Sequence, residues 1–139
     1  MIMQDEMKIF DTLVIGGGIA GQEAALNLAE MNHQVLLVEK DLSIGGKMIQ
    51  LSKVFPTLDC AACITTPKMS ETARHHNITL KLYTEIDAID KQNDGSFLVT
   101  ITEKARYVDP SLCTGCQECE FVCPQVINDH YNYDMVGRK

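Results

Sequence analysis

Four cysteines in the C-terminal part of the chain stand at a spacing that suits an iron–sulfur cluster. Cys113, Cys116, Cys119 and Cys123 follow the pattern C-x2-C-x2-C-x3-C, and Pro124 comes directly after the last of them. Bacterial ferredoxins use this spacing, with thiolates holding the iron atoms. Gly115 is expected to relieve crowding in this turn. The run therefore predicts a [4Fe–4S] cluster, whose chemistry is the transfer of electrons.

Two other interpretations bear on this run. Structural zinc sites pair two cysteine knuckles across a longer spacer, whereas all four cysteines here lie in one short loop. In two-cluster ferredoxins the fourth cysteine ligates the other cluster. Cys123 therefore either completes the cluster of Cys113, Cys116 and Cys119 or belongs to a second one. The chain has six cysteines, so a second cluster would need ligands from outside this sequence.

Cys60 and Cys63 form a separate C-x2-C pair in the middle of the chain. Such a pair can ligate a metal, form a redox disulfide, or pack as two small apolar groups. The spacing alone does not choose among these, and both residues are second-rank ligand candidates.

A glycine fingerprint near the N-terminus predicts a dinucleotide site. Gly16, Gly18 and Gly21 fit G-x-G-x-x-G after an apolar strand and before a helix, which is the context that gives this pattern meaning. In such a turn the first glycine permits the bend, the second lets the backbone approach a pyrophosphate, and the third lets the helix pack closely. The helix N-terminus supplies free N–H groups for the anion.

The fingerprint alone does not separate FAD from NAD, and the residues after the second strand tilt the choice toward FAD and disfavour a 2′-phosphorylated cofactor. Glu39 lies at the strand end, where a carboxylate accepts hydrogen bonds from an adenosine ribose and repels a 2′-phosphate. Lys40 follows it, and Gly45-Gly46-Lys47 could bring backbone and an ammonium near the diphosphate. A Glu followed by Gly-Gly resembles FAD-binding flavoproteins with two dinucleotide domains. We therefore expect Gly16, Gly18, Gly21, Glu39, Lys40, Gly46 and Lys47 to bind FAD.

The elements that must position these residues follow from the apolar pattern. Strand 9–15, helix 21–31 and strand 35–39 predict a βαβ unit with parallel strands. Beyond them we expect a glycine-containing loop over 40–48, a helix over 67–76 with Pro67 in its first turn, and a strand over 78–83. Strands 86–89 and 97–101 should form a hairpin through Asn93-Asp94-Gly95.

The fold class that results is α/β. We expect the start of a Rossmann-like FAD-binding domain, βαβ plus β-meander, over 1–108, and a small ferredoxin-like cluster-binding segment over 109–139. The stretch 106–110 is the expected boundary between them.

Composition and charge exclude several other classes. The net charge of −7 argues against nucleic acid, which needs clustered Lys and Arg. No apolar stretch is long enough to span a membrane. The first ten residues carry Asp5 and Glu6 and no long apolar core, so we expect no signal peptide and a cytoplasmic protein with reduced thiols. No Ser-His-Asp arrangement or carboxylate pair suggests proton or acyl chemistry, so no catalytic residue is assigned.

The chain resembles the A subunit of heterodisulfide reductase over nearly its whole length. The resemblance rests on segments in the same order along the chain, of which Phe55–Cys60 is the most specific. The segments are Val14–Gly21, Val38–Lys40, Ser43–Met48, Phe55–Cys60, Cys63–Met69, Ala73–His75, Arg106–Asp109 and Cys113–Pro124.

This resemblance implies an FAD-containing iron–sulfur subunit of an oxidoreductase from an anaerobe, as in methanogenesis. Such subunits relay electrons between a hydrogenase or formate dehydrogenase side and the B and C subunits, and in some systems one electron goes to ferredoxin. Family members run several hundred residues. We therefore expect this chain to be an N-terminal portion that is not active alone.

Two functions from different classes fit the sequence. The first is that of an electron-transfer flavin and iron–sulfur subunit, which relays electrons between FAD and [4Fe–4S] clusters. The second is that of a non-catalytic, ferredoxin-like electron carrier, which holds a cluster and no flavin.

Overall fold

A computed structural model of the chain describes residues 7–109 and 111–138. The N-terminal residues Asp5 and Glu6, and Pro110 at the end of the expected boundary stretch, lie outside these ranges. The chain divides into two compact units, and the division falls between Lys104 and Ala105.

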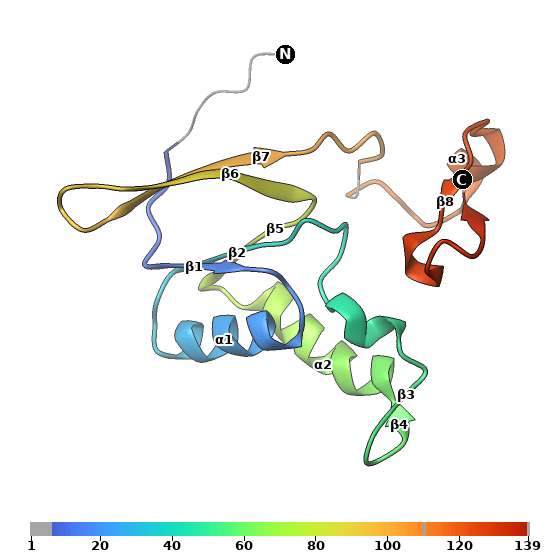
Figure 1. The fold of residues 1–139 in the computed structure, drawn as a ribbon, viewed down its shortest axis with the longest axis horizontal. Coiled ribbons are helices and arrows are strands. Elements are labelled where there is room, and N and C mark those ends of the chain that lie inside the picture. The colour runs from blue at the N-terminus through green and yellow to red at the C-terminus, as the bar shows by residue number, and fades with distance from the viewer. Residues whose placement is uncertain (1–6, 110, 139) are drawn as a thin grey trace. The chain divides into compact units, whose positions relative to one another are not determined.

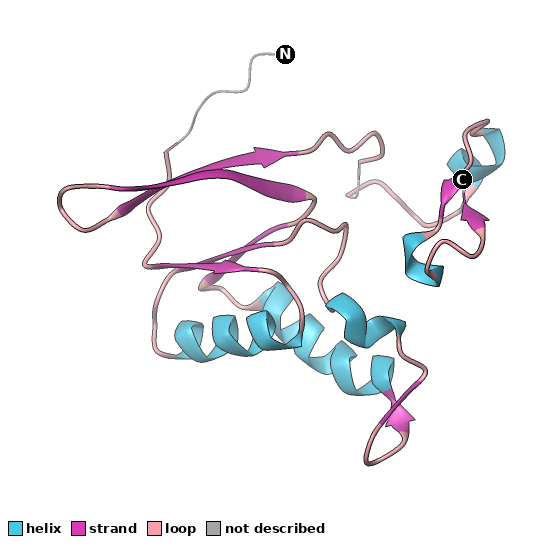
Figure 2. Ribbon diagram, in the orientation of Figure 1, coloured by secondary structure: helices cyan, strands magenta, loops and turns pink. Residues whose placement is uncertain are grey.

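The first unit holds most of the helices and strands (Figures 1 and 2). In chain order they are β1 Thr12–Ile15, α1 Ile19–Glu30, β2 Val35–Val38, the 3-10 helix η1 Gly46–Gln50, β3 Lys53–Val54, β4 Asp59–Cys60, α2 Ala61–Arg74, β5 Ile78–Lys81, β6 Thr84–Lys91 and β7 Phe97–Glu103.

A three-stranded parallel sheet with the order β1-β2-β5 organises this unit. Thr12 pairs with Val35 and Val35 pairs with Ile78, so β2 is the central strand. Three of its four residues are buried, as expected for a parallel strand covered on both faces. The βαβ unit and the Rossmann-like fold class predicted from the sequence are confirmed.

The place of β5 differs from the predicted meander. The sequence predicts strand 78–83 beside the hairpin, but β5 pairs in parallel with β2. A parallel neighbour needs a long crossover, and the segment containing η1 and α2 supplies one. The sheet therefore has a third parallel strand that the apolar pattern does not reveal.

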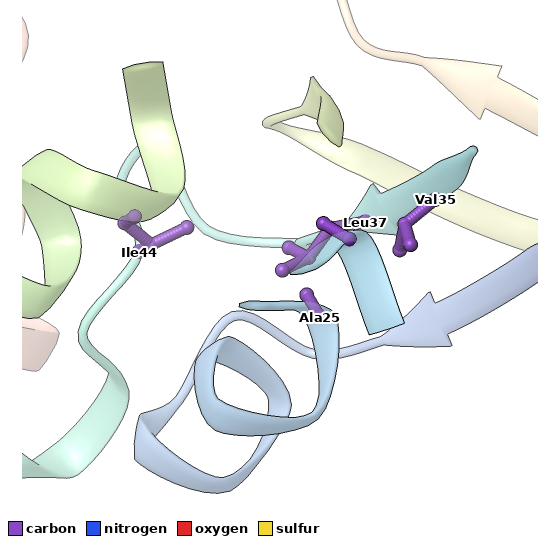
Figure 3. Close-up of a cluster of buried hydrophobic side chains, with 5 residues drawn as sticks. Ala25, Val35, Leu37 and Ile44 are labelled. Carbon is purple, nitrogen blue, oxygen red and sulfur yellow. The ribbon is translucent and has the colours of Figure 1, made fainter. Parts of the chain in front are cut away.

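The core lies between α1 and the sheet. Ala25 and Ala29 of α1 meet Val35 and Leu37 of β2, and Ile44 joins them from the loop after β2. Figure 3 shows Ala25 facing the strand that carries Leu37 and Val35. Small alanines at helical spacing let the helix approach the strand closely, which brings the N-terminus of α1 up to the glycine turn.

Helix α2 begins earlier than predicted. It runs from Ala61 to Arg74 with Pro67 in its interior, so the expected start at Pro67 is wrong. Ala61, Thr65 and Thr72 form a buried stripe, and the two threonine hydroxyls donate to the carbonyls of Ala61 and Lys68 at 2.8 and 2.9 Å. Packing of this stripe outweighs the preference of proline for a first turn.

The predicted hairpin is confirmed, with longer strands. β6 and β7 pair from Thr84↔Glu103 to Lys91↔Phe97, and a tight turn through Gly95 joins them. The amide of Thr84 donates to the carbonyl of Glu39 at 3.0 Å, which ties the hairpin to the end of β2. Figure 1 shows α1 and α2 on one side of the parallel sheet and the hairpin on the other.

The second unit is built from short elements around the cysteine run. They are α3 Glu118–Val122, β8 Ile127–Asn128, the 3-10 helix η2 His130–Asn132 and β9 Gly137–Arg138. β8 and β9 pair antiparallel. Across both units, none of the described helices is long and apolar enough to cross a membrane.

Candidate functional site

The glycine turn joins β1 directly to α1. The amide of Gly16 donates to the carbonyl of Val38 at 2.8 Å, and Gly16 adopts a φ of +97° that favours glycine. Gly18 is the N-cap of α1 and offers no side-chain hydrogen bond to the first amides of the helix. A helix N-terminus of this kind is suited to a phosphate group.

Gly18 and Gly21 are glycines for opposite reasons. A Cβ added at Gly21 would lie 1.9 Å from the carbonyl oxygen of Gly16, so only glycine lets α1 pack against the turn. A Cβ added at Gly18 would meet no atom within 4 Å. The protein's own packing therefore leaves Gly18 free to carry a side chain, and the open space beside it suits a pyrophosphate.

Glu39 supports the turn from the end of β2. Its carboxylate accepts the Gly17 amide at 2.6 Å and the Asp41 amide at 3.0 Å, and the residue is 6% exposed. A Cβ at Gly17 would lie 2.5 Å from Ile44 Cγ2. The sequence pattern assigns Glu39 to a ribose and gives Gly17 no role. The run of three adjacent glycines is the signal that Gly17 is also constrained.

A second residue that the sequence pattern misses is Gln22. It is fully buried, and its side-chain Nε2 donates to the carbonyl of Gly17 at 2.8 Å. The amide of Gly45 donates to the same carbonyl at 2.8 Å. Gly17 is thus held by side chains and backbone from three segments, which fixes the shape of the turn before any nucleotide binds.

The glycine turn opens into a hollow of about 390 Å³. Lys47 lines it together with Gly16, Gly18 and Gly21, and its side chain is exposed. Lys40 is exposed on the loop after β2, and the described residues that line the hollow do not include it. Gly46 packs against Gly18, where a Cβ would lie 3.1 Å from Gly18 Cα. The turn, the helix end and the Lys47 ammonium therefore fit the ADP half of FAD.

The cysteine run lines a hollow of about 700 Å³ in the second unit. Cys113, Cys116, Cys119 and Cys123 all contribute to its lining. Cys113 follows a turn in which its amide donates to the carbonyl of Asp109 at 3.0 Å. Among the described residues, no three His, Cys, Asp or Glu side chains converge closely enough to hold a single metal ion.

Four thiols line one hollow, and four is the number of cysteine ligands that a [4Fe–4S] cluster takes from a protein. In a [4Fe–4S] cluster each thiolate binds a different iron, so the four sulfurs stand apart around a body of several atoms. Four thiols around one hollow offer that chemistry. The Cys123 thiol contacts the carbonyl of Gln125 at 3.7 Å, a weak contact that leaves its sulfur available.

The backbone of the loop favours the thiolate form at one position. The amide of Glu118, followed by the Thr114 hydroxyl, lowers the pKa of the Cys116 thiol because both donate to its sulfur. Gly115 has a φ of +72°, and a Cβ added there would meet open space. Its φ favours glycine, and its relief of crowding beside a bound cluster stays a prediction because Gly115 lines the thiol hollow.

Cys60 and Cys63 lie together at the start of α2, and both are exposed. The interpretation of this pair as two buried apolar groups is therefore wrong. The backbone amide of Cys63 and then its thiol lower the pKa of Cys60. The Cys60 side chain in turn raises the pKa of Cys63, because one proton shared between two sulfurs favours one thiolate over two.

Comparison with known protein families agrees with this geometry. Residues 11–119 match the FAD-dependent oxidoreductase family, a stretch that contains the glycine turn, Glu39 and the first three cysteines of the run. The chain belongs to this family.

Curated relatives show which FAD-dependent oxidoreductases this chain is most usefully compared with. An iron–sulfur A subunit of CoB–CoM heterodisulfide reductase from Methanopyrus kandleri is 48% identical over 91% of this chain and 19% of its own length. The A subunit of the H2:CoB–CoM heterodisulfide, ferredoxin reductase from Methanothermobacter marburgensis is 49% identical over 86% of this chain and 18% of its own length. The resemblance to the N-terminal portion of the heterodisulfide reductase A subunit is confirmed, and the chain spans about a fifth of these relatives.

Two solved structures of other proteins superpose on about two thirds of this chain. L-proline dehydrogenase from P. horikoshii superposes with a TM-score of 0.59 and 25% identity, covering 68% of this chain and 19% of that one. Thioredoxin reductase from T. acidophilum superposes with a TM-score of 0.58 at 21% identity, covering 68% of this chain and 31% of that one. The Rossmann-like architecture of the first unit is shared with these folds.

Replacing Glu39 with glutamine tests its role in holding the turn. The Gln amide would present an N–H to a backbone N–H, either that of Gly17 or that of Asp41, in a buried position. We expect a loss of about 2–3 kcal/mol in the free energy of unfolding, because hydrogen bonds to a charged acceptor are lost. Urea unfolding followed by circular dichroism measures it. The matched control is Glu30→Gln at the exposed end of α1, and equal stability of the two variants would contradict the role assigned to Glu39.

Proposed function

We propose that this chain is part of the electron-transfer flavin and iron–sulfur subunit of a heterodisulfide reductase-like complex, and that it relays electrons between FAD and [4Fe–4S] clusters. The observation that carries the proposal is the presence of two hollows of different chemistry in one chain. One is lined by glycine backbone and Lys47, and the other by four thiols.

The residues that would hold the flavin are those of the first hollow and its support. Gly16, Gly18 and Gly21 would face the diphosphate from the lining of the hollow, Gly46 would support Gly18 by packing against it, and Lys47 would offer an ammonium. Glu39 holds the turn, and we assign it with Lys40 to the ribose side. When bound, FAD supplies the exchange of electron pairs for single electrons. The residues of this chain bind and orient its ADP half.

The residues that would hold the cluster are Cys113, Cys116, Cys119 and Cys123 of the second hollow. Amide and hydroxyl donors around Cys116 favour a negatively charged sulfur, which is the state of a cluster ligand. Cys60 and Cys63 are the second-rank ligand candidates.

The partners belong to the same proposal. We expect B-type and C-type heterodisulfide reductase subunits, a hydrogenase or formate dehydrogenase side, and ferredoxin, in the cytoplasm and without nucleic acid. The name of the Methanothermobacter marburgensis relative contains H2 and ferredoxin. These two words support the proposal of a hydrogenase side and of ferredoxin as partners.

Spectroscopy of the anaerobically purified chain tests the proposal against the carrier without flavin. After incubation with FAD and reconstitution with iron and sulfide, we expect both broad cluster absorption and a flavin that is released as FAD on denaturation. Cluster absorption with no releasable flavin would favour the ferredoxin-like carrier. Bound flavin with less than about one iron per chain would contradict the cluster.

A further inference from the structure

Gln22 is a buried carboxamide behind the glycine turn. It lies near the start of α1 and is fully buried, and the described residues that line the glycine hollow do not include it. Its Nε2 atom donates to the carbonyl of Gly17 at 2.8 Å. Gln22 therefore acts on the turn from the protein side and not from the side that faces the hollow.

Different side chains hold the two peptide groups on either side of the Gly17 Cα. The peptide group before it is held by Glu39, whose carboxylate accepts the Gly17 amide at 2.6 Å. The peptide group after it, which joins Gly17 to Gly18, is held through the Gly17 carbonyl. This carbonyl accepts from the Gln22 side chain and from the Gly45 amide, both at 2.8 Å. Glu39 thus fixes the first peptide plane, and Gln22 together with Gly45 fixes the second.

The direction of the Gly18 amide follows from the second peptide plane. In a planar trans peptide the C=O and the N–H point in opposite directions. The Gly17 carbonyl points toward the buried Gln22, so the Gly18 N–H points away from it. Gly18 lines the hollow, and within residues 7–109 and 111–138 its N–H finds no acceptor. This N–H is therefore a free donor on the wall of the hollow.

The other polar atom of the Gln22 side chain is a poor contributor to stability. Oε1 is buried and accepts no hydrogen bond from the part of the chain that the structure describes. A buried polar atom without a partner lowers the free energy of unfolding, and an apolar side chain of similar length would avoid that loss. What an apolar residue could not supply is the Nε2 hydrogen bond to the turn. The carboxamide therefore suits a role in shaping the turn better than a role in stability.

We propose that Gln22 is a positioning residue that aims the Gly18 N–H at the diphosphate of the bound nucleotide. The inference rests on the proposed binding of the ADP half of FAD in this hollow. Gln22 touches no part of the nucleotide and acts through the Gly17 carbonyl. It holds the second peptide plane in the orientation that presents the Gly18 N–H to an anion. A donor that is aligned in advance need not be ordered during binding, which strengthens the affinity.

Gln22→Met in the full chain tests this role. Methionine is similar in length to glutamine and has no donor, so the Gly17 carbonyl keeps only the Gly45 amide and the peptide plane is free to turn. We expect the affinity for ADP to fall about tenfold, because a hydrogen bond to a charged phosphate loses its alignment. The midpoint of urea unfolding should stay the same or rise, since the unpaired Oε1 is removed. Isothermal titration calorimetry and circular dichroism measure the two quantities.

Adenosine separates a role toward the diphosphate from a general effect on the site. It has no phosphate, so it cannot use the Gly18 N–H. We expect the unmodified chain and Gln22→Met to bind adenosine equally in titrations followed by NMR. In the 1H–15N spectrum of the unmodified chain, the Gly18 amide should shift when ADP is added and should not shift with adenosine. This last measurement needs no variant.

Gln34→Met is the matched control for the loss of a carboxamide. The Gln34 Nε2 atom donates to Asn77 Oδ1 at 2.9 Å, so this variant also removes one side-chain hydrogen bond of the first unit. Gln34 directly precedes β2, at the opposite end of that strand from Glu39. We expect Gln34→Met to bind ADP as tightly as the unmodified chain.

Three outcomes would overturn the proposal while ADP still binds the unmodified chain. One is a Gln22→Met chain that binds ADP as tightly as the unmodified chain does. Another is an equal loss of affinity for ADP and for adenosine, which would make Gln22 a support of the whole site. The third is a Gly18 amide that does not respond to bound ADP. An unmodified chain that bound neither ADP nor FAD would instead overturn the proposed function, and the role of Gln22 with it.

Discussion

Cys116→Ser should remove most of the iron that the chain can hold. We expect about four iron atoms per chain in the reconstituted protein and fewer than about one in the variant. Cys116 has the strongest structural support among the four cysteines, because the Glu118 amide and the Thr114 hydroxyl both donate to its sulfur. A serine hydroxyl is a hard oxygen ligand and replaces a thiolate poorly at an iron–sulfur site. Iron and acid-labile sulfide analysis measures the loss.

Two further variants test whether Cys123 also holds the iron and whether the loss of iron is specific to this run. Cys123→Ser should lose iron to a similar extent, since Cys123 lines the same hollow as the other three cysteines. If Cys123→Ser kept its full iron content, Cys123 would belong to a second cluster or to none. Ser43→Ala is the control, because it changes an exposed residue of the first unit that belongs to neither cysteine group. Full retention of iron in Cys116→Ser would contradict the cluster at this run.

Gly18→Val should abolish nucleotide binding and leave the fold and the iron content intact. Gly18 has a φ of −70° in the extended region, and an added Cβ meets no atom within 4 Å. The fold therefore accepts a side chain there, with a change in stability within about 0.5 kcal/mol. The same side chain would occupy the space that the pyrophosphate needs. We expect the affinity for FAD to fall about a hundredfold or more, equal to about 2.7 kcal/mol.

Gly21→Ala provides the contrast for this prediction. Its Cβ would lie 1.9 Å from the carbonyl oxygen of Gly16, so α1 or the turn must shift. We expect a loss of about 1–3 kcal/mol in the free energy of unfolding, together with a loss of FAD affinity. Thermal unfolding and flavin fluorescence titration distinguish the two variants. If Gly18→Val bound FAD as tightly as the unmodified chain, the pyrophosphate would lie elsewhere.

Chemistry that depends on local spacing could be predicted from the sequence. The cysteine spacing from Cys113 to Cys123 predicts a ligand set, because all four candidates lie in one short loop, and the structure places the four thiols around one hollow. The glycine fingerprint predicts the turn because its requirements are local, a positive φ at Gly16 and the close approach of Gly21 to the Gly16 carbonyl. The hairpin through Gly95 followed from its turn residues in the same way.

Features that depend on packing between distant segments could not be predicted in this way. Pro67 suggested a helix start, but burial of Ala61, Thr65 and Thr72 against the rest of the first unit extends α2 back to Ala61. That stripe contains two threonines, so it gives no apolar signal. The parallel pairing of β5 with β2 likewise depends on a crossover that brings Ile78 beside Val35.

The sequence by itself determined which groups are present and how they are spaced: a dinucleotide turn, a ferredoxin-type cysteine run, and an acid at the end of the second strand. Only the tertiary structure decided what those groups contact. It joined Glu39 to the Gly17 amide across 22 residues, and it placed Cys60 opposite Lys53 at the start of a helix. The physical reason is that ligand spacing and backbone geometry are local properties of the chain, whereas burial, cross-strand pairing and the partner of a carboxylate are set by segments that meet only when the chain folds.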